Sequence, residues 1–143
     1  MILDDLADYL TSQGVVVPGG SVQEQGTVYG LYQGYLPATP NRAVALYETG
    51  GMAPVHTHST GPGTAVVEYP RVQVAVRSSA YSTGRLTIQR IYAVLDGFRT
   101  RSLNGTVYHW AAAIQPPFLL ERDENQRTVF ACNFEFTKEL STA

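Results

Sequence analysis

Apolar and polar residues alternate most regularly in residues 68–77. The apolar positions, which share one face of an extended chain, are Val72, Val74 and Val76. The other face carries Arg71, Gln73, Ala75 and Arg77. This two-residue period predicts a half-buried strand. Its polar face suits contact with a partner as well as it suits solvent.

Two segments, residues 2–13 and 78–96, repeat their apolar residues at helical spacing. The first has acidic residues in its first turn, where the helix dipole favours negative charge. In the second, Ser78 or Ser79 can cap the helix start. A glycine follows each segment and can close the helix. The sequence therefore predicts an N-terminal helix and one longer helix.

Further segments have strand-like composition or alternation, namely residues 27–34, 42–48, 98–103, 106–114 and 127–137. Asn104-Gly105 is a strong hairpin signal, so the strands on either side of it should be antiparallel. The proline pair in residues 115–120 should end the second of these strands, because proline cannot donate to a ladder. Residues 121–126 are expected to form a polar connection.

The element order is helix, strands, helix, hairpin and strand, which predicts an α+β fold in a single domain over residues 1–143. We expect a mainly antiparallel sheet, with the N-terminal helix and the longer helix packed on one face. Residues 15–26 should be loop. Residues 49–63 hold two prolines and four glycines and should form a flexible loop that contacts a partner. The C-terminus should fray from about residue 138.

The charge content is low, at 15% of residues, and the pI is near 5.9. A dedicated nucleic-acid binder normally carries a basic patch, so this class is disfavoured. Lys138 is the one lysine among ten basic residues, and arginine is the more frequent of the two at interfaces. Composition leaves two interpretations open: an ordinary globular domain, or a subunit whose surface is largely covered by neighbours.

Candidate chemistry is sparse. His56 and His58 have metal-ligand spacing, but a zinc site needs three or four ligands, and whether His109 approaches them cannot be read from the sequence. We expect solvated loop histidines, with a small metal-binding module or enzyme using these three as the alternative. No nucleophile elbow or phosphate-binding loop occurs in the sequence, so we assign no catalytic, cofactor-binding or metal residues.

The single cysteine, Cys132, excludes an internal disulfide and should be a buried thiol beside three phenylalanines. No signal-peptide pattern starts the sequence, and no apolar run approaches about twenty residues. We therefore expect a protein made in a reducing compartment, without membrane partners.

Several short segments together resemble one known family. They are Gly34-Tyr-Leu-Pro37, Pro40-Asn-Arg-Ala-Val44, Glu48-Thr-Gly-Gly51, Tyr69-Pro-Arg-Val-Gln-Val-Ala-Val-Arg77, Tyr81, Leu95-Asp-Gly97, Asn104-Gly105, Gln115-Pro-Pro-Phe118, Asp123-Glu-Asn-Gln-Arg127 and Asn133-Phe134. In this order they resemble the minor capsid or tail-completion family of long-tailed bacteriophages, whose members act as tail terminators. The resemblance covers roughly residues 28–137.

This resemblance implies a structural virion protein without catalytic residues, assembled in the host cytoplasm into the tail or neck. It implies a homo-hexameric ring that caps the tail tube, docks to the head-tail connector or stopper protein, and lets DNA pass through its channel without specific binding. Another neck ring, such as a head-completion or stopper protein, is the alternative. Our candidate contact residues are Arg71, Gln73, Arg77, Gly50, Gly51, Met52, His56 and His58.

Overall fold

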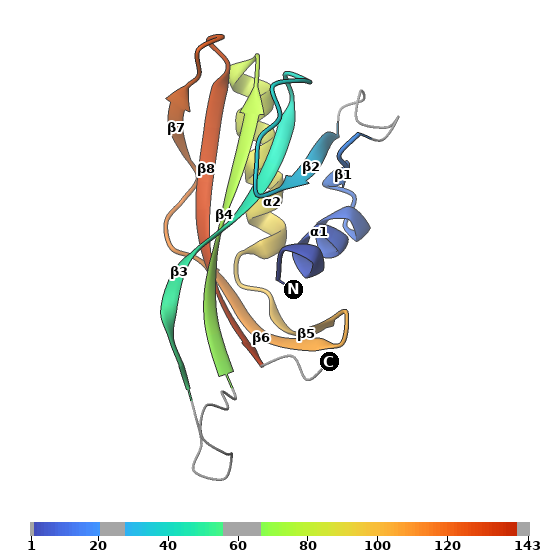
Figure 1. Cartoon of the computed structure of the whole chain (residues 1–143), viewed down its shortest axis with the longest axis vertical. Coiled ribbons are helices and arrows are strands. Elements are labelled where there is room, and N and C mark those ends of the chain that lie inside the picture. Colours follow the sequence, from blue (N-terminus) through green and yellow to red (C-terminus); the bar gives the residue numbers. More distant parts are fainter. Residues whose placement is uncertain (1, 21–27, 56–66, 140–143) are drawn as a thin grey trace.

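The computed structural model describes residues 2–20, 28–55 and 67–139, with the backbone alone at residues 52–55. These residues form two helices and eight strands (Figure 1). In chain order the elements are α1 (Ile2–Ser12), β1 (Val16–Pro18), β2 (Tyr29–Gln33), β3 (Ala43–Val55), β4 (Val67–Ser78), α2 (Tyr81–Leu95), β5 (Arg99–Leu103), β6 (Thr106–Ala113), β7 (Phe118–Arg122) and β8 (Thr128–Glu139).

The strands form one sheet in the order β1-β2-β3-β4-β8-β6-β5, and β7 pairs with β8 outside this path. β1, β2 and β3 pair in parallel, and every other pairing in the sheet is antiparallel. Long curved strands β3, β4 and β8 make its centre (Figure 1). The predicted α+β fold with a mainly antiparallel sheet is confirmed at this level.

Both helices pack on one face of the sheet, where the core lies. From the sheet the core takes Val44, Leu46, Val72, Val74, Val76, Phe130, Cys132, Phe134 and Phe136. The helices add Leu3, Leu6 and Leu10 from α1 and Ile88, Ile91 and Leu95 from α2. Each large side chain buried in this way contributes about 1.5–3 kcal/mol. The alternation that predicted the inward valines of β4 is confirmed by their complete burial.

The Asn104-Gly105 hairpin is confirmed, and it also anchors the N-terminal helix. Both residues have positive φ, 51° and 83°, as a tight two-residue turn requires. The Asn104 side-chain amide donates to the carboxylates of Asp5 and Asp8 on α1, at 3.1 and 2.9 Å. Tyr108 of β6 donates to the same Asp5 carboxylate at 2.5 Å. α1 is therefore fixed to the hairpin by polar contacts as well as by its apolar face.

The start of the longer helix differs from the prediction that Ser78 or Ser79 caps it. Ala80 occupies the cap position and makes no side-chain cap hydrogen bond. Ser78 is instead the last residue of β4, because its carbonyl accepts the Thr128 hydroxyl of β8 at 3.0 Å. The Ser78 hydroxyl accepts from Tyr29 and from the Ala80 N–H, so it still supports the turn into the helix.

The expected loop at residues 49–63 is wrong for its first part. β3 continues to Val55 and pairs with β4, with register shifts between Thr49 and Met52 and between Met52 and Val55. The glycines that favoured a loop serve these shifts, which let the ribbon bend. Residues 56–63 lie outside the described residues.

Two short strands were also not predicted. β1 lies within the expected loop at residues 15–26, where it pairs with β2, and residues 21–27 lie outside the described part. β7 lies where a strand end and a polar connection were expected. A strand of three residues, or one that follows a proline pair, is too short or irregular to show an alternating pattern in the sequence. Such strands form because they pair with a neighbouring strand. No helix in the described residues is long and apolar enough to cross a membrane.

Candidate interface on the open face of the sheet

The face of the sheet opposite the helices is built from directly opposed residues of β3, β4 and β8. Its two central rows are Tyr47, Gln73 and Asn133, followed by Thr49, Arg71 and Glu135. We call this surface the outer face. Because side chains alternate between faces, these residues, apart from Thr49, are strand neighbours of core residues. The polar strand face predicted from sequence is therefore real at Arg71 and Gln73.

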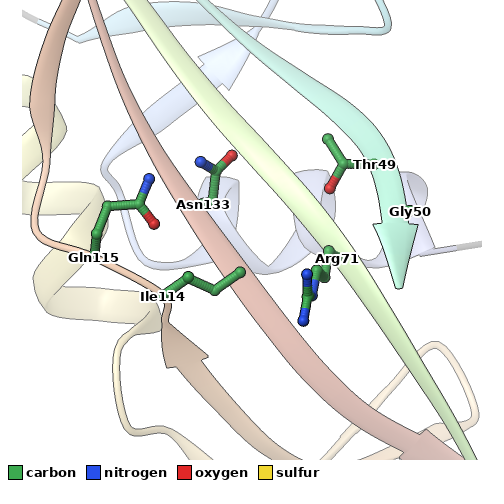
Figure 2. A pocket seen from close by; sticks show the side chains of 6 residues that line it. All are labelled: Thr49, Gly50, Arg71, Ile114, Gln115 and Asn133. Carbon is green, nitrogen blue, oxygen red and sulfur yellow. The ribbon is translucent and has the colours of Figure 1, made fainter. Parts of the chain in front are cut away.

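A hollow of about 660 Å³ opens on the outer face (Figure 2). Its lining residues are Thr49, Gly50, Arg71, Ile114, Gln115 and Asn133. The hollow forms beside residues 114–117, which connect the end of β6 to the start of β7. In this stretch the Ile114 N–H donates to the Asn133 carbonyl at 2.8 Å, and the edge of β8 beyond that bond is not paired with a strand until β7 begins. Gly50 adds no side chain to fill it.

Gln115 brings an unsatisfied acceptor to this hollow. Its side-chain Oε1 is buried and has no hydrogen-bond partner among the described residues. Its backbone carbonyl, in contrast, accepts from the Cys132 thiol at 3.2 Å. A buried amide oxygen without a partner costs about 1–3 kcal/mol. A donor supplied by a docked molecule would remove that cost once the Gln115 side chain rotates to turn Oε1 toward the hollow.

Arg71 and Glu135 form an ion pair beside the hollow. The Arg71 Nε donates to the Glu135 carboxylate at 2.9 Å, and the two side chains are 39% and 30% exposed. The pair neutralises both charges while leaving the planar guanidinium accessible. Such a surface is weakly charged, as interface cores are.

Trp110 and Ile114 are contact candidates that the sequence did not reveal. Trp110 is 42% exposed, and the Arg99 guanidinium carbon lies 5.0 Å from the centroid of its ring. Strict alternation would place Trp110 on the same face as the fully buried Tyr108. A register shift between these two residues turns Trp110 outward, opposite Thr137 and next to the row of Glu135. Ile114, half exposed, borders the hollow.

Arg77, predicted as a contact residue, is turned to its own chain. It is only 4% exposed. Its Nη2 and Nε donate to the carbonyl oxygens of Pro40 and Asn41 at 2.6 and 3.2 Å. Burial lowers the pKa of Arg77, and the nearby positive charge of Arg127 lowers it further. The segment between β2 and β3 covers this end of the strand, so Arg77 offers nothing to a partner.

The remaining predicted contact residues fall into three cases. Gly50 lies open at the hollow, whereas Gly51 is enclosed, because a Cβ there would lie 2.1 Å from the Tyr69 carbonyl oxygen. Met52 lies in β3, where the structure describes the backbone alone. His56 and His58 lie outside the described residues.

Two of the groups considered for chemistry, His109 and Cys132, lie in the described residues. Among the described residues, no group of three or more His, Cys, Asp or Glu is placed to hold a metal ion. His109 lies instead beside Glu139, with Nε2 3.3 Å from the carboxylate. The predicted buried position of Cys132 is confirmed, and burial raises the pKa of its thiol to about 12. A thiol held protonated in this way is a poor nucleophile.

Comparison with known proteins gives one family and one shared fold. The family model described as "Bacteriophage tail terminator protein" matches residues 9–140. A search of curated proteins found no match. Among solved structures, a chain in the "Virion of native gene transfer agent (GTA) particle" is similar in fold, with a TM-score of 0.57 and 13% identity over 95% of this chain and 94% of that chain. Because the family match spans most of its length, the chain belongs to the bacteriophage tail terminator family and is a structural phage protein.

Proposed function

We propose that this protein forms a hexameric ring that caps the phage tail tube and joins it to the head-tail connector or stopper protein. We further propose that the ring is assembled in the host cytoplasm and has no catalytic role. Membership of the tail terminator family supports this function. The structural observation that carries it is the outer face, an uncovered sheet surface that combines an exposed tryptophan, an exposed isoleucine and a hollow.

The outer face has the composition of a protein contact. Tryptophan, tyrosine and arginine dominate the binding energy of interfaces, and here Trp110, Tyr47 and Arg71 occupy one surface. In a ring, each copy meets its neighbours through two different surfaces, each burying about 800 Å² per partner. The low charge content of the chain is consistent with that loss of exposed surface.

The charge balance supports a channel that does not grip DNA. The formal net charge is −2, and at least five of the nine arginines bond to atoms of their own chain, namely Arg71, Arg77, Arg85, Arg122 and Arg127. Tight binding of DNA requires several free cations that replace condensed counterions. A mildly acidic ring therefore lets the genome slide through.

Electron microscopy of the purified protein tests the ring. We expect sixfold particles for the wild-type protein and fewer or none for Trp110→Ala, which truncates the exposed side chain most typical of interfaces. Tyr35→Ala is the matched control, because Tyr35 is an exposed aromatic residue in the segment between β2 and β3, outside the rows of β3, β4 and β8 and the residues that line the hollow. Equal ring formation by all three proteins would contradict the role of the outer face.

Phage lacking the protein separates a terminator from another neck ring. Loss of a terminator should give overlong tails, whereas loss of a head-completion or stopper protein should give heads that leak DNA. Elemental analysis of the purified protein addresses the metal-binding alternative. A stoichiometric transition metal that is lost when His56, His58 and His109 are replaced by alanine would overturn the purely structural assignment.

A further inference from the structure

A second exposed apolar surface lies on the helix side of the molecule, between α2 and β7. Tyr81 is 53% exposed, and its ring meets the buried Phe130 ring edge-on at a centroid distance of 5.1 Å. Leu119, 43% exposed, is the ladder partner of the same Phe130, and the neighbouring Leu120 is 46% exposed. We call Tyr81, Leu119 and Leu120 the β7–α2 patch.

The patch is held in place by Arg85 of α2. Its Nη1 donates to the Pro117 carbonyl at 2.9 Å, directly before β7 begins. Its guanidinium carbon lies 6.0 Å from the centroid of the Phe130 ring. Arg85 therefore links α2 to the start of β7 beneath the patch. Because the exposed side chains stand on fixed elements, little ordering is required when they dock.

The strand edge at the patch has no strand partner among the described residues and exposes apolar side chains. Within the described residues β7 pairs with β8 alone, so its other edge has no strand partner. Sheet edges of monomeric proteins are normally blunted by charge, proline or a covering element. β1 is short, ends in Pro18 and contacts α1, and β5 carries Arg99 and Arg101. β7 has charged residues too, Glu121 and Arg122, but its first part exposes Leu119 and Leu120.

We propose that the β7–α2 patch docks onto the outer face of a second copy of this chain, with Tyr81 directed to the hollow beside Ile114 and Gln115. This inference rests on the proposed ring, which needs two different surfaces on each copy. The patch and the outer face lie on opposite faces of the sheet, so one copy can engage two neighbours at once. Repeating this contact from copy to copy gives a closed ring if the rotation between neighbouring copies divides a full turn evenly.

The chemistry of the two surfaces is complementary. The hollow offers an apolar wall at Ile114 and a buried acceptor at Gln115 Oε1 that lacks a donor. Tyr81 presents an apolar ring and a hydroxyl that can donate. The leucines of the patch match the exposed ring of Trp110 in character. Docking would therefore bury apolar surface and satisfy an orphan polar atom in the same step.

Mixing two defective variants tests this pairing. Leu119→Glu places a charge in the patch, and Ile114→Glu places one at the hollow. Each variant alone should be monomeric by native mass spectrometry, because every contact between two identical copies would include one surface that carries the new glutamate. An equimolar mixture should form 1:1 dimers and nothing larger, because each mixed pair retains one contact with both sides intact. Tyr35→Glu, which charges an exposed residue outside the patch and outside the lining of the hollow, should form wild-type rings.

The outcomes are distinguishable once thermal unfolding confirms that the variants are folded. Wild-type rings formed by Leu119→Glu overturn the pairing and leave the ring function standing. Rings that form but fail to join tails assign the patch to another virion protein and also overturn it. A mixture that stays monomeric shows that the two surfaces are not partners. A wild-type protein that never forms rings overturns the proposed function together with this inference.

A double-mutant cycle examines the contact between residues. Tyr81→Phe removes only the donor hydroxyl and should weaken ring assembly several-fold when Gln115 is present. In a Gln115→Leu background the same substitution should have little further effect. Equal effects in both backgrounds would show that the hydroxyl does not meet Gln115.

Discussion

The guanidinium of Arg77 donates from Nη2 to the carbonyl oxygen of Pro40 at 2.6 Å and so fixes the segment between β2 and β3 against the end of β4. Arg71 lies six residues earlier on the same strand face, yet it points into an open surface and pairs with Glu135. Two arginines with the same position in the sequence pattern therefore have different roles. One holds the fold together, and the other is available to a partner.

Arg77→Ala should destabilise the monomer. The substitution removes the charged donor that the carbonyls of Pro40 and Asn41 share, which should lower the free energy of unfolding by about 2–3 kcal/mol. Urea denaturation followed by circular dichroism measures this. Arg77→Lys should recover only part of the loss, because lysine lacks the planar fork. An unfolding curve identical to that of the wild type would show that the segment does not depend on Arg77.

Arg71→Ala should leave stability nearly unchanged and should weaken ring assembly, in contrast to Arg77→Ala. Its ion pair with Glu135 is partly exposed, and pairs of this kind contribute less than about 1 kcal/mol to stability. We therefore expect a near-normal unfolding free energy together with weaker ring assembly, measured by native mass spectrometry over a concentration series. Loss of stability as large as that of Arg77→Ala, with assembly unchanged, would place Arg71 among the structural residues instead.

Gly51→Ala should disturb the ribbon formed by β3 and β4. A Cβ at this position would lie 2.1 Å from the Tyr69 carbonyl oxygen, and backbone cannot yield as a flexible side chain can. We expect a loss of about 1–3 kcal/mol, as for other overpacked sites. Gly50→Ala is the control on the adjacent residue, where nothing lies within 4 Å of a Cβ. Equal stability of the two variants would mean that the ribbon adjusts to the added methyl group.

Tyr108→Phe should loosen the attachment of α1 to the hairpin. The variant keeps the ring in the core but removes the hydroxyl that donates to the buried Asp5 carboxylate. Among the described residues, that carboxylate then keeps the Asn104 amide as its side-chain donor. We expect a loss of about 1–3 kcal/mol on chemical denaturation. Tyr35→Phe removes a hydroxyl from an exposed ring and should be neutral. Faster amide exchange in α1 would localise the effect, whereas unchanged exchange would contradict it.

The Cys132 thiol should make stability fall at alkaline pH. Its folded pKa, raised by burial to about 12, exceeds the ordinary value of 9.0. The resulting stabilisation is complete below pH 9.0 and is lost as the pH rises from there toward about 12, because the unfolded chain releases the proton first. The slope can reach about 1.4 kcal/mol per pH unit. Denaturation on both sides of pH 9.0 should show a shallower decline for Cys132→Ala, and parallel declines would refute this role.

The sequence by itself determined the elements whose signals are local. The alternation in β4, the helical periods of α1 and α2 and the turn chemistry of Asn104-Gly105 each depend on neighbouring residues, so they were predictable. The resemblance carried by short segments in order also pointed to the family that the comparison shows. Among the contact candidates, Arg71 and Gly50 line the hollow, although only the position of Arg71 on the polar strand face followed from local alternation.

Only the tertiary structure decided which polar residues remain available. Arg77 is buried by a segment more than thirty residues away in sequence, as its bond to Pro40 shows. Trp110 reaches the outer face through a register shift between β6 and β8, and Ile114 borders a hollow that exists because β6 and β7 divide the edge of β8 between them. Strand pairing and coverage are properties of long-range packing, and a residue's own sequence neighbours do not encode them.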